Sequence, residues 1–148
     1  MIVSALLSQR FRYATAPAAI TTLIELALSG RHWPNRSLFY LSDQRCSSPD
    51  EDGHGGHYPG HQLGVGTTRD GHHAALHYCA RTPREVVAQS LSAPPLPDAP
   101  EIIYDAEAQE FFPTNAVLPR DLAHAAIAEY LRTGAQPTVI TWQPAHIL

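Results

Sequence analysis

The sequence predicts an α+β fold, with a mainly antiparallel sheet of about five or six strands and two helices packed on one face. Two stretches repeat apolar residues at helical spacing, whereas the other apolar runs are short and bounded by turn residues. A chain of 148 residues is long enough to bury one sizeable core. We therefore expect residues 1–148 to form a single domain.

The N-terminal part predicts a strand over residues 1–7, followed by a helix that begins at Pro17. The opening apolar run lacks a basic flank and is too short for a membrane span or a secretory signal. Apolar residues then recur at helical spacing up to Gly30, which can end the helix. They are Ile20, Leu23, Ile24, Ala27 and Leu28.

The middle of the chain predicts a strand over residues 37–41, a mobile loop over residues 46–57 and two hairpins. Asp70 and Gly71 form a turn signal between strand-like residues 61–68 and 72–79. Residues 101–104 and 110–112 are expected to pair as the second hairpin. Between the hairpins lies a proline-rich connection in which residues 84–91 form either a helical turn or a short strand.

The C-terminal part specifies a helix and a last strand. Pro119 suits the first helical turn, and Asp121 places negative charge near the positive end of the helix dipole. Gly134 can take the left-handed conformation that ends a helix, and Pro137 prevents the helix from resuming before a strand over residues 138–142. The expected buried stripe comprises Leu122, Ala123, Ala126, Ile127, Tyr130 and Leu131.

The same region carries a signature with a fixed order and spacing. It contains an FP pair at residues 112–113, an LP pair at residues 118–119 and a helix-and-turn motif from Ala126 to a final tryptophan. Upstream, the LGVG run at residues 63–66 and the ALHY run at residues 75–78 complete the pattern. The characteristic residues of the motif are Glu129, Thr133, Gly134, Pro137 and Trp142.

This pattern resembles the Imm-one family of immunity proteins, which protect bacteria against their own polymorphic toxins. The resemblance implies a protein that binds one cognate toxin and blocks its active site. It also implies that the toxin is a nucleic-acid deaminase, with a nuclease as second choice, used in competition between bacteria. The partner is therefore expected to be a toxin domain.

Composition argues against several other functions. The net charge is −4 without a basic run, so direct nucleic-acid binding is not expected. The chain has no lysine and therefore no phosphate-binding loop of the usual kind, and it shows no nucleophile elbow. We expect a cytoplasmic monomer with reduced Cys46 and Cys79, no enzyme activity, no cofactor and no membrane association.

Acidic residues in two segments are candidates for toxin binding, because clustered negative charge can mimic phosphate and steer a basic partner. The ordinary alternative is a solvated loop. The first group is Asp43, Asp50, Glu51 and Asp52, and the second group, in the second hairpin, is Asp105, Glu107 and Glu110.

A histidine cluster supports the alternative function, a small metal-dependent enzyme. His54, His57 and His61 lie at spacings of three and four, and imidazole is a common zinc ligand. Surrounding glycines make the ordering of three ligands costly in conformational entropy, and no further ligand obviously completes the site. In the other cluster, His73 and His77 share a strand face, whereas His72 takes the other.

Overall fold

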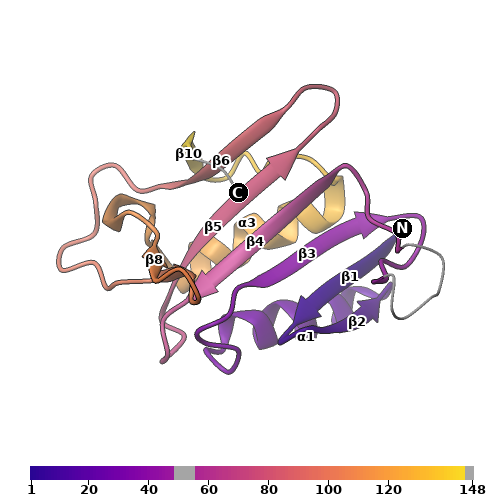
Figure 1. Ribbon diagram of the computed structural model, residues 1–148, viewed down its shortest axis with the longest axis horizontal. Coiled ribbons are helices and arrows are strands. Elements are labelled where there is room, and N and C mark those ends of the chain that lie inside the picture. Colours follow the sequence, from indigo (N-terminus) through magenta and orange to yellow (C-terminus); the bar gives the residue numbers. More distant parts are fainter. Residues whose placement is uncertain (49–55, 146–148) are drawn as a thin grey trace.

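The computed structural model describes residues 1–48 and 56–145, and it confirms the α+β fold. Both α-helices of this part of the chain lie behind the same face of a large antiparallel sheet (Figure 1). The sheet has eight strands in the described residues, so the expected number of five or six was too low. Its main path runs β10-β6-β5-β4-β3-β1-β2, and β9 pairs with one end of β5.

The strands of this sheet are β1 (Ile2–Leu7), β2 (Arg10–Ala14), β3 (Ser37–Ser42), β4 (His61–Thr67), β5 (His73–Ala80), β6 (Val86–Leu91), β9 (Leu118–Pro119) and β10 (Thr141–Pro144). The predicted second hairpin is confirmed as a separate two-stranded sheet of β7 (Ile103–Asp105) and β8 (Glu110–Phe111). The helices are α1 (Pro17–Leu28), the short 3-10 helix η1 (Thr114–Ala116) and α3 (Arg120–Thr133).

Strand β2 accounts for part of the difference in strand number. It pairs with β1 through a two-residue turn formed by Ser8 and Gln9, whose φ angles are 47° and 66°. Turns of this kind favour asparagine and glycine, which adopt positive φ at little cost. Because Ser-Gln carries no such signal, the sequence does not predict the hairpin that makes residues 10–14 a strand.

Residues of the proline-rich connection and of the C-terminal segment form the far edge of the sheet. Residues 86–91, for which the sequence allows a helical turn or a short strand, form β6 between β5 and β10. The last strand begins at Thr141, three residues later than expected. The backbone N–H groups of Thr138 and Val139 donate instead to the Glu129 carboxylate.

The main core lies between the helices and the sheet. The apolar stripes of both helices are confirmed, with only Ile20 and Leu122 partly exposed. Tyr130 and Phe39 are the largest fully buried side chains of the described residues. The sheet residues that face the helices are on alternate positions of each strand, as Leu63 and Val65 are on β4.

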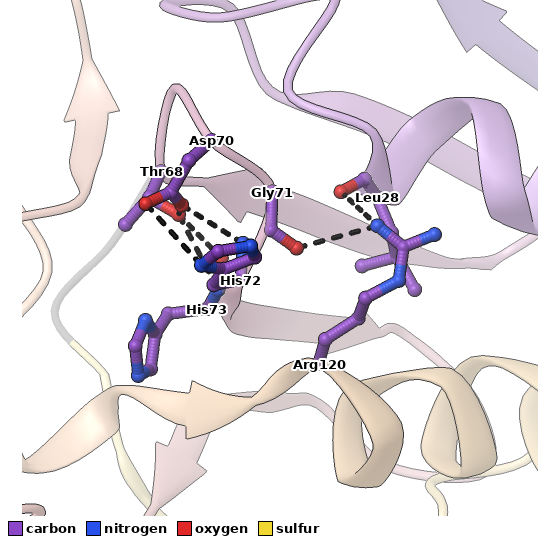
Figure 2. Close-up of polar contacts among 7 residues, drawn as sticks. All are labelled: Leu28, Thr68, Asp70, Gly71, His72, His73 and Arg120. Carbon is purple, nitrogen blue, oxygen red and sulfur yellow. Dashed lines mark hydrogen bonds and ion pairs between the residues drawn. The ribbon is translucent and has the colours of Figure 1, made fainter.

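Arg120 joins three segments that are distant in sequence (Figure 2). Its Nη1 donates to the Leu28 carbonyl at 2.8 Å and to the Gly71 carbonyl at 3.3 Å, and its Nη2 pairs with Glu25. The Leu28 carbonyl is one of the groups left unsatisfied at the end of α1. Arg120 therefore fixes both α1 and the β4–β5 turn to the start of α3.

The predicted turn of the first hairpin is also held by Asp70. Its Oδ1 accepts hydrogen bonds from the Thr68 hydroxyl at 2.7 Å and the His72 N–H at 2.9 Å (Figure 2). These bonds lower the pKa of Asp70. No helix among the described residues has the length and apolar character needed to cross a membrane.

Candidate functional site

The C-terminal signature builds the junction between α3 and β10. Gly134 ends the helix with a φ of 71°, and the Thr133 hydroxyl donates to the Glu129 carbonyl at 3.0 Å. The indole N–H of Trp142 donates to the Pro137 carbonyl at 2.8 Å. The Trp142 ring is partly buried against the main core. These residues therefore contribute to packing and to the turn between α3 and β10.

Glu129 has a structural contact for each carboxylate oxygen. Oε2 accepts from the Thr138 N–H at 2.6 Å and the Thr138 hydroxyl at 3.0 Å, and Oε1 accepts from the Val139 N–H at 3.1 Å. The Thr138 N–H is the main cause that lowers the pKa of Glu129. The Glu129 carboxylate thus accepts the backbone N–H groups of residues 138 and 139, which the sequence predicts to lie in the last strand.

A cysteine and a histidine lie next to each other on β5 and require a test as a nucleophilic pair. The Sγ atom of Cys79 is 3.4 Å from Nδ1 of His77, whose Nε2 is 3.4 Å from the Tyr104 hydroxyl. Burial lowers the pKa of His77 to about 4, with a smaller effect of Arg36, and burial raises the pKa of Cys79. An activated cysteine needs the opposite shift towards thiolate. The pair is therefore neutral at pH 7.

The histidines of the metal hypothesis make separate contacts. His54 lies outside the described residues. Nε2 of His57 is 3.3 Å from the Ser42 hydroxyl, and Nδ1 of His61 is 2.7 Å from the Tyr130 hydroxyl under α3. Within residues 1–48 and 56–145, no three His, Cys, Asp or Glu side chains are grouped to hold a metal ion.

The acidic candidates that the structure describes lie at opposite ends of β3. Asp43 is exposed directly after β3, whereas Asp50, Glu51 and Asp52 lie outside the described residues. The other candidates are exposed on the β7–β8 hairpin, beyond the start of β3. The length of β3, about 17 Å, separates Asp43 from the second group. The second group comprises Asp105, Glu107 and Glu110.

The β7–β8 hairpin lies on the sheet face opposite the helices (Figure 1). Ile102 and Phe112 pack there with Ala75 in a second hydrophobic cluster, which has no residue in common with the main core. A Cβ atom on Gly66 would lie 2.9 Å from Phe112 Cε2 and 3.0 Å from Ile102 Cγ2. The glycine thus allows the hairpin to approach the sheet.

We call residues 92–117 the acidic layer, because all of its charged side chains are acidic. Residues 86–119 contain five acidic side chains and no arginine, lysine or histidine. All five are exposed, and no salt bridge joins them to another described residue. Two of them, Asp98 and Glu101, are not among the residues predicted to bind a toxin, although the long gap between basic residues in the sequence marks them. The five are Asp98, Glu101, Asp105, Glu107 and Glu110.

Two hollows lie on the same face of the sheet. The smaller one, of about 270 Å³, lies beside the hairpin tip and is lined in part by Leu38, Asp105 and Glu107. The larger one, of about 870 Å³, lies at the other end of β4 and β5, next to Tyr40 and Tyr58. The acidic layer therefore covers only one end of the open face.

The comparison with protein families matches residues 12–144 to the model described as Immunity protein Imm1. The chain belongs to the Imm1 family. No curated protein gives a significant match. The Imm1 match includes the C-terminal signature, the glycines of β4 and the whole acidic layer.

Imm1 membership makes this chain an immunity protein that binds a cognate toxin. The buried contacts of the signature leave few of its side chains for a partner, since Gly134 and Pro137 shape the chain and Trp142 packs inward. The acidic layer, in contrast, presents exposed charge on a fixed support. We therefore take the acidic layer of this Imm1 protein as the candidate functional site.

Proposed function

We propose that this protein inhibits one polymorphic toxin by covering its active site, and that the toxin is a nucleic-acid deaminase, with a nuclease as second choice. The inhibition takes place in the cytoplasm, where the nucleic acid of the protected cell lies. The single observation that carries toxin inhibition is the Imm1 family match over residues 12–144.

The acidic layer supports a nucleic-acid enzyme as the target. Enzymes that act on DNA or RNA bind the phosphate backbone with lysine and arginine, so their substrate channels are positively charged. A segment with five exposed carboxylates and no basic side chain of its own complements such a channel. Both deaminases and nucleases have this requirement, and charge alone does not distinguish them.

The inhibition is expected to be stoichiometric, because it needs only a stable complex. Glu107 and Ala108 donate their N–H groups to Oδ1 of Asp105, at 3.0 and 3.1 Å, which fixes the hairpin tip. A surface that is ordered before binding loses less entropy when the complex forms. Rigid occlusion thus fits the geometry better than an enzymatic attack on the toxin.

The test is to express the toxin domain encoded by the neighbouring gene, with and without this protein, and to titrate the purified pair. We expect growth to be restored and toxin activity to fall to zero at a ratio of one to one. Base changes in a single-stranded DNA or RNA substrate identify a deaminase, and strand breaks identify a nuclease. Failure to protect cells or to bind the toxin would refute the proposed function.

A further inference from the structure

We infer that the acidic layer binds the toxin through Phe111, which inserts into an apolar slot surrounded by basic residues of the toxin. This inference rests on the proposed function and specifies the contact surface. It makes Phe111 the anchor of the interface and the surrounding carboxylates its charged rim.

Phe111 has an unusual position for a large apolar side chain. It lies on β8 and is 50% exposed, whereas the next residue, Phe112, is 4% exposed. Because side chains alternate along a strand, the burial of Phe112 directs Phe111 away from the sheet. An aromatic side chain held in this way offers a large contact area with little loss of rotamer freedom.

The support beneath Phe111 is rigid. The Phe112 N–H donates to the Ile102 carbonyl at 2.9 Å, and the Phe112 ring packs edge-on against Tyr104 at 5.3 Å. The Arg36 guanidinium stacks on the Tyr104 ring, with Arg36 Cζ 4.1 Å from the ring centroid. The anchor thus stands on an ordered aromatic and apolar base.

The charge around the anchor indicates the chemistry of the partner. Glu110 precedes Phe111 in β8, and Asp105 pairs with Glu110 across the hairpin. The hollow of about 270 Å³ beside the tip is lined by Asp105 and Glu107 and by Arg36, whose guanidinium is held on the Tyr104 ring, and it provides room for a partner side chain. Apolar centres with a charged rim are the usual arrangement of protein interfaces. A basic surface with a central apolar slot is the complementary partner.

The test measures binding to a catalytically inactive toxin domain at low and high salt, with the full-length protein. Phe111→Ala removes the anchor, and Val139→Ala is its matched control, because Val139 is 48% exposed outside the acidic layer. We expect Phe111→Ala to weaken binding about 30-fold or more, as for a central aromatic hot spot. Val139→Ala should change the affinity less than about threefold.

The charged rim is tested by the triple variant Asp105→Asn, Glu107→Gln and Glu110→Gln. Asparagine keeps the Oδ1 acceptor that orders the turn, so the fold is retained. We expect association at low salt to slow about tenfold and its salt dependence to flatten. A double control, Glu85→Gln with Asp121→Asn, removes two exposed carboxylates outside the acidic layer and should leave association within about twofold of the wild type.

The outcomes separate this inference from the proposed function. If the wild-type protein binds the toxin and the Phe111 and triple variants bind equally well, the interface lies elsewhere and the inference is wrong. If the wild-type protein does not bind, the proposed function itself fails. Urea unfolding of each variant shows whether a loss of binding comes from a loss of the fold.

Discussion

The substitution Gly66→Ala tests whether the acidic layer depends on close approach to β4. The added Cβ atom would lie 2.9 Å from Phe112 Cε2, 3.0 Å from Ile102 Cγ2 and 3.1 Å from the Ile103 carbonyl oxygen. Carbon atoms in contact normally lie about 3.5 to 4.0 Å apart. The hairpin must therefore move away by several tenths of an ångström, and one of the obstacles is backbone.

The expected cost follows from overpacking, which typically destabilises a core by about 1 to 3 kcal/mol. Replacing glycine by alanine in a strand also stabilises the fold by about 0.5 to 1 kcal/mol, because the unfolded chain loses conformational freedom. We therefore expect Gly66→Ala to lower the free energy of unfolding by about 1 to 2 kcal/mol. The displaced hairpin should also weaken toxin binding.

Gly64→Ala is the matched control on the same strand face. Its Cβ atom would meet Arg36 Nη1 at 3.1 Å, Leu38 Cδ2 at 3.4 Å and the His77 carbonyl oxygen at 3.6 Å, so only side-chain atoms, including the Arg36 guanidinium on Tyr104, need to shift. We expect this variant to stay within about 0.5 kcal/mol of the wild type in urea unfolding. Equal stability of the two variants would show that Gly66 does not set the height of the hairpin.

Three further substitutions test other contacts. Glu129→Gln should lower the free energy of unfolding by about 1 kcal/mol at pH 7. This difference from the wild type should shrink as the pH falls below about 4, because the hydrogen bonds that lower the pKa of Glu129 stabilise the fold only while its carboxylate is ionised. Burial lowers the pKa of His77 to about 4, so the unfolded chain takes up the proton first and the wild type loses stability as the pH falls from about 6.5 towards 4. His77→Gln should reduce this pH dependence of the free energy of unfolding, by up to about 1 kcal/mol per pH unit in urea titrations. Arg120→Lys should cost about 1 to 2 kcal/mol, because one ammonium cannot replace the guanidinium fork, whereas Arg132→Lys on the exposed surface should change the unfolding midpoint little.

The sequence predicted those elements whose signals are local. The helices follow from apolar stripes with clear ends, such as Gly134, and the first hairpin follows from the turn at Asp70 and Gly71. Strand β2 was missed because its turn uses Ser8 and Gln9 in a conformation that their residue types do not announce. The late start of β10 depends on the Glu129 side chain, which binds the backbone N–H of Thr138 nine residues later, and strand periodicity carries no such information.

The candidate site was predicted only in part. The sequence marks Asp105, Glu107 and Glu110 as a charged turn, but it does not show that Asp43 lies at the other end of the sheet. The exposure of Phe111 also depends on the tertiary structure, because either residue of the FF pair could have faced the core. The structure decides this by placing the next ring over Gly66.

The separation of the two hydrophobic clusters bears on how such a protein acquires a new target. Outward-facing residues of the acidic layer make no contribution to the helix-facing core, so replacing them leaves most of the folding free energy intact. Substitutions at the junction between α3 and β10 are more costly, because Glu129 and Trp142 each make a hydrogen bond to the backbone of that turn. Substitutions on the outward side of the hairpin can therefore change the surface that the protein offers to a toxin without disturbing the sheet and its helices.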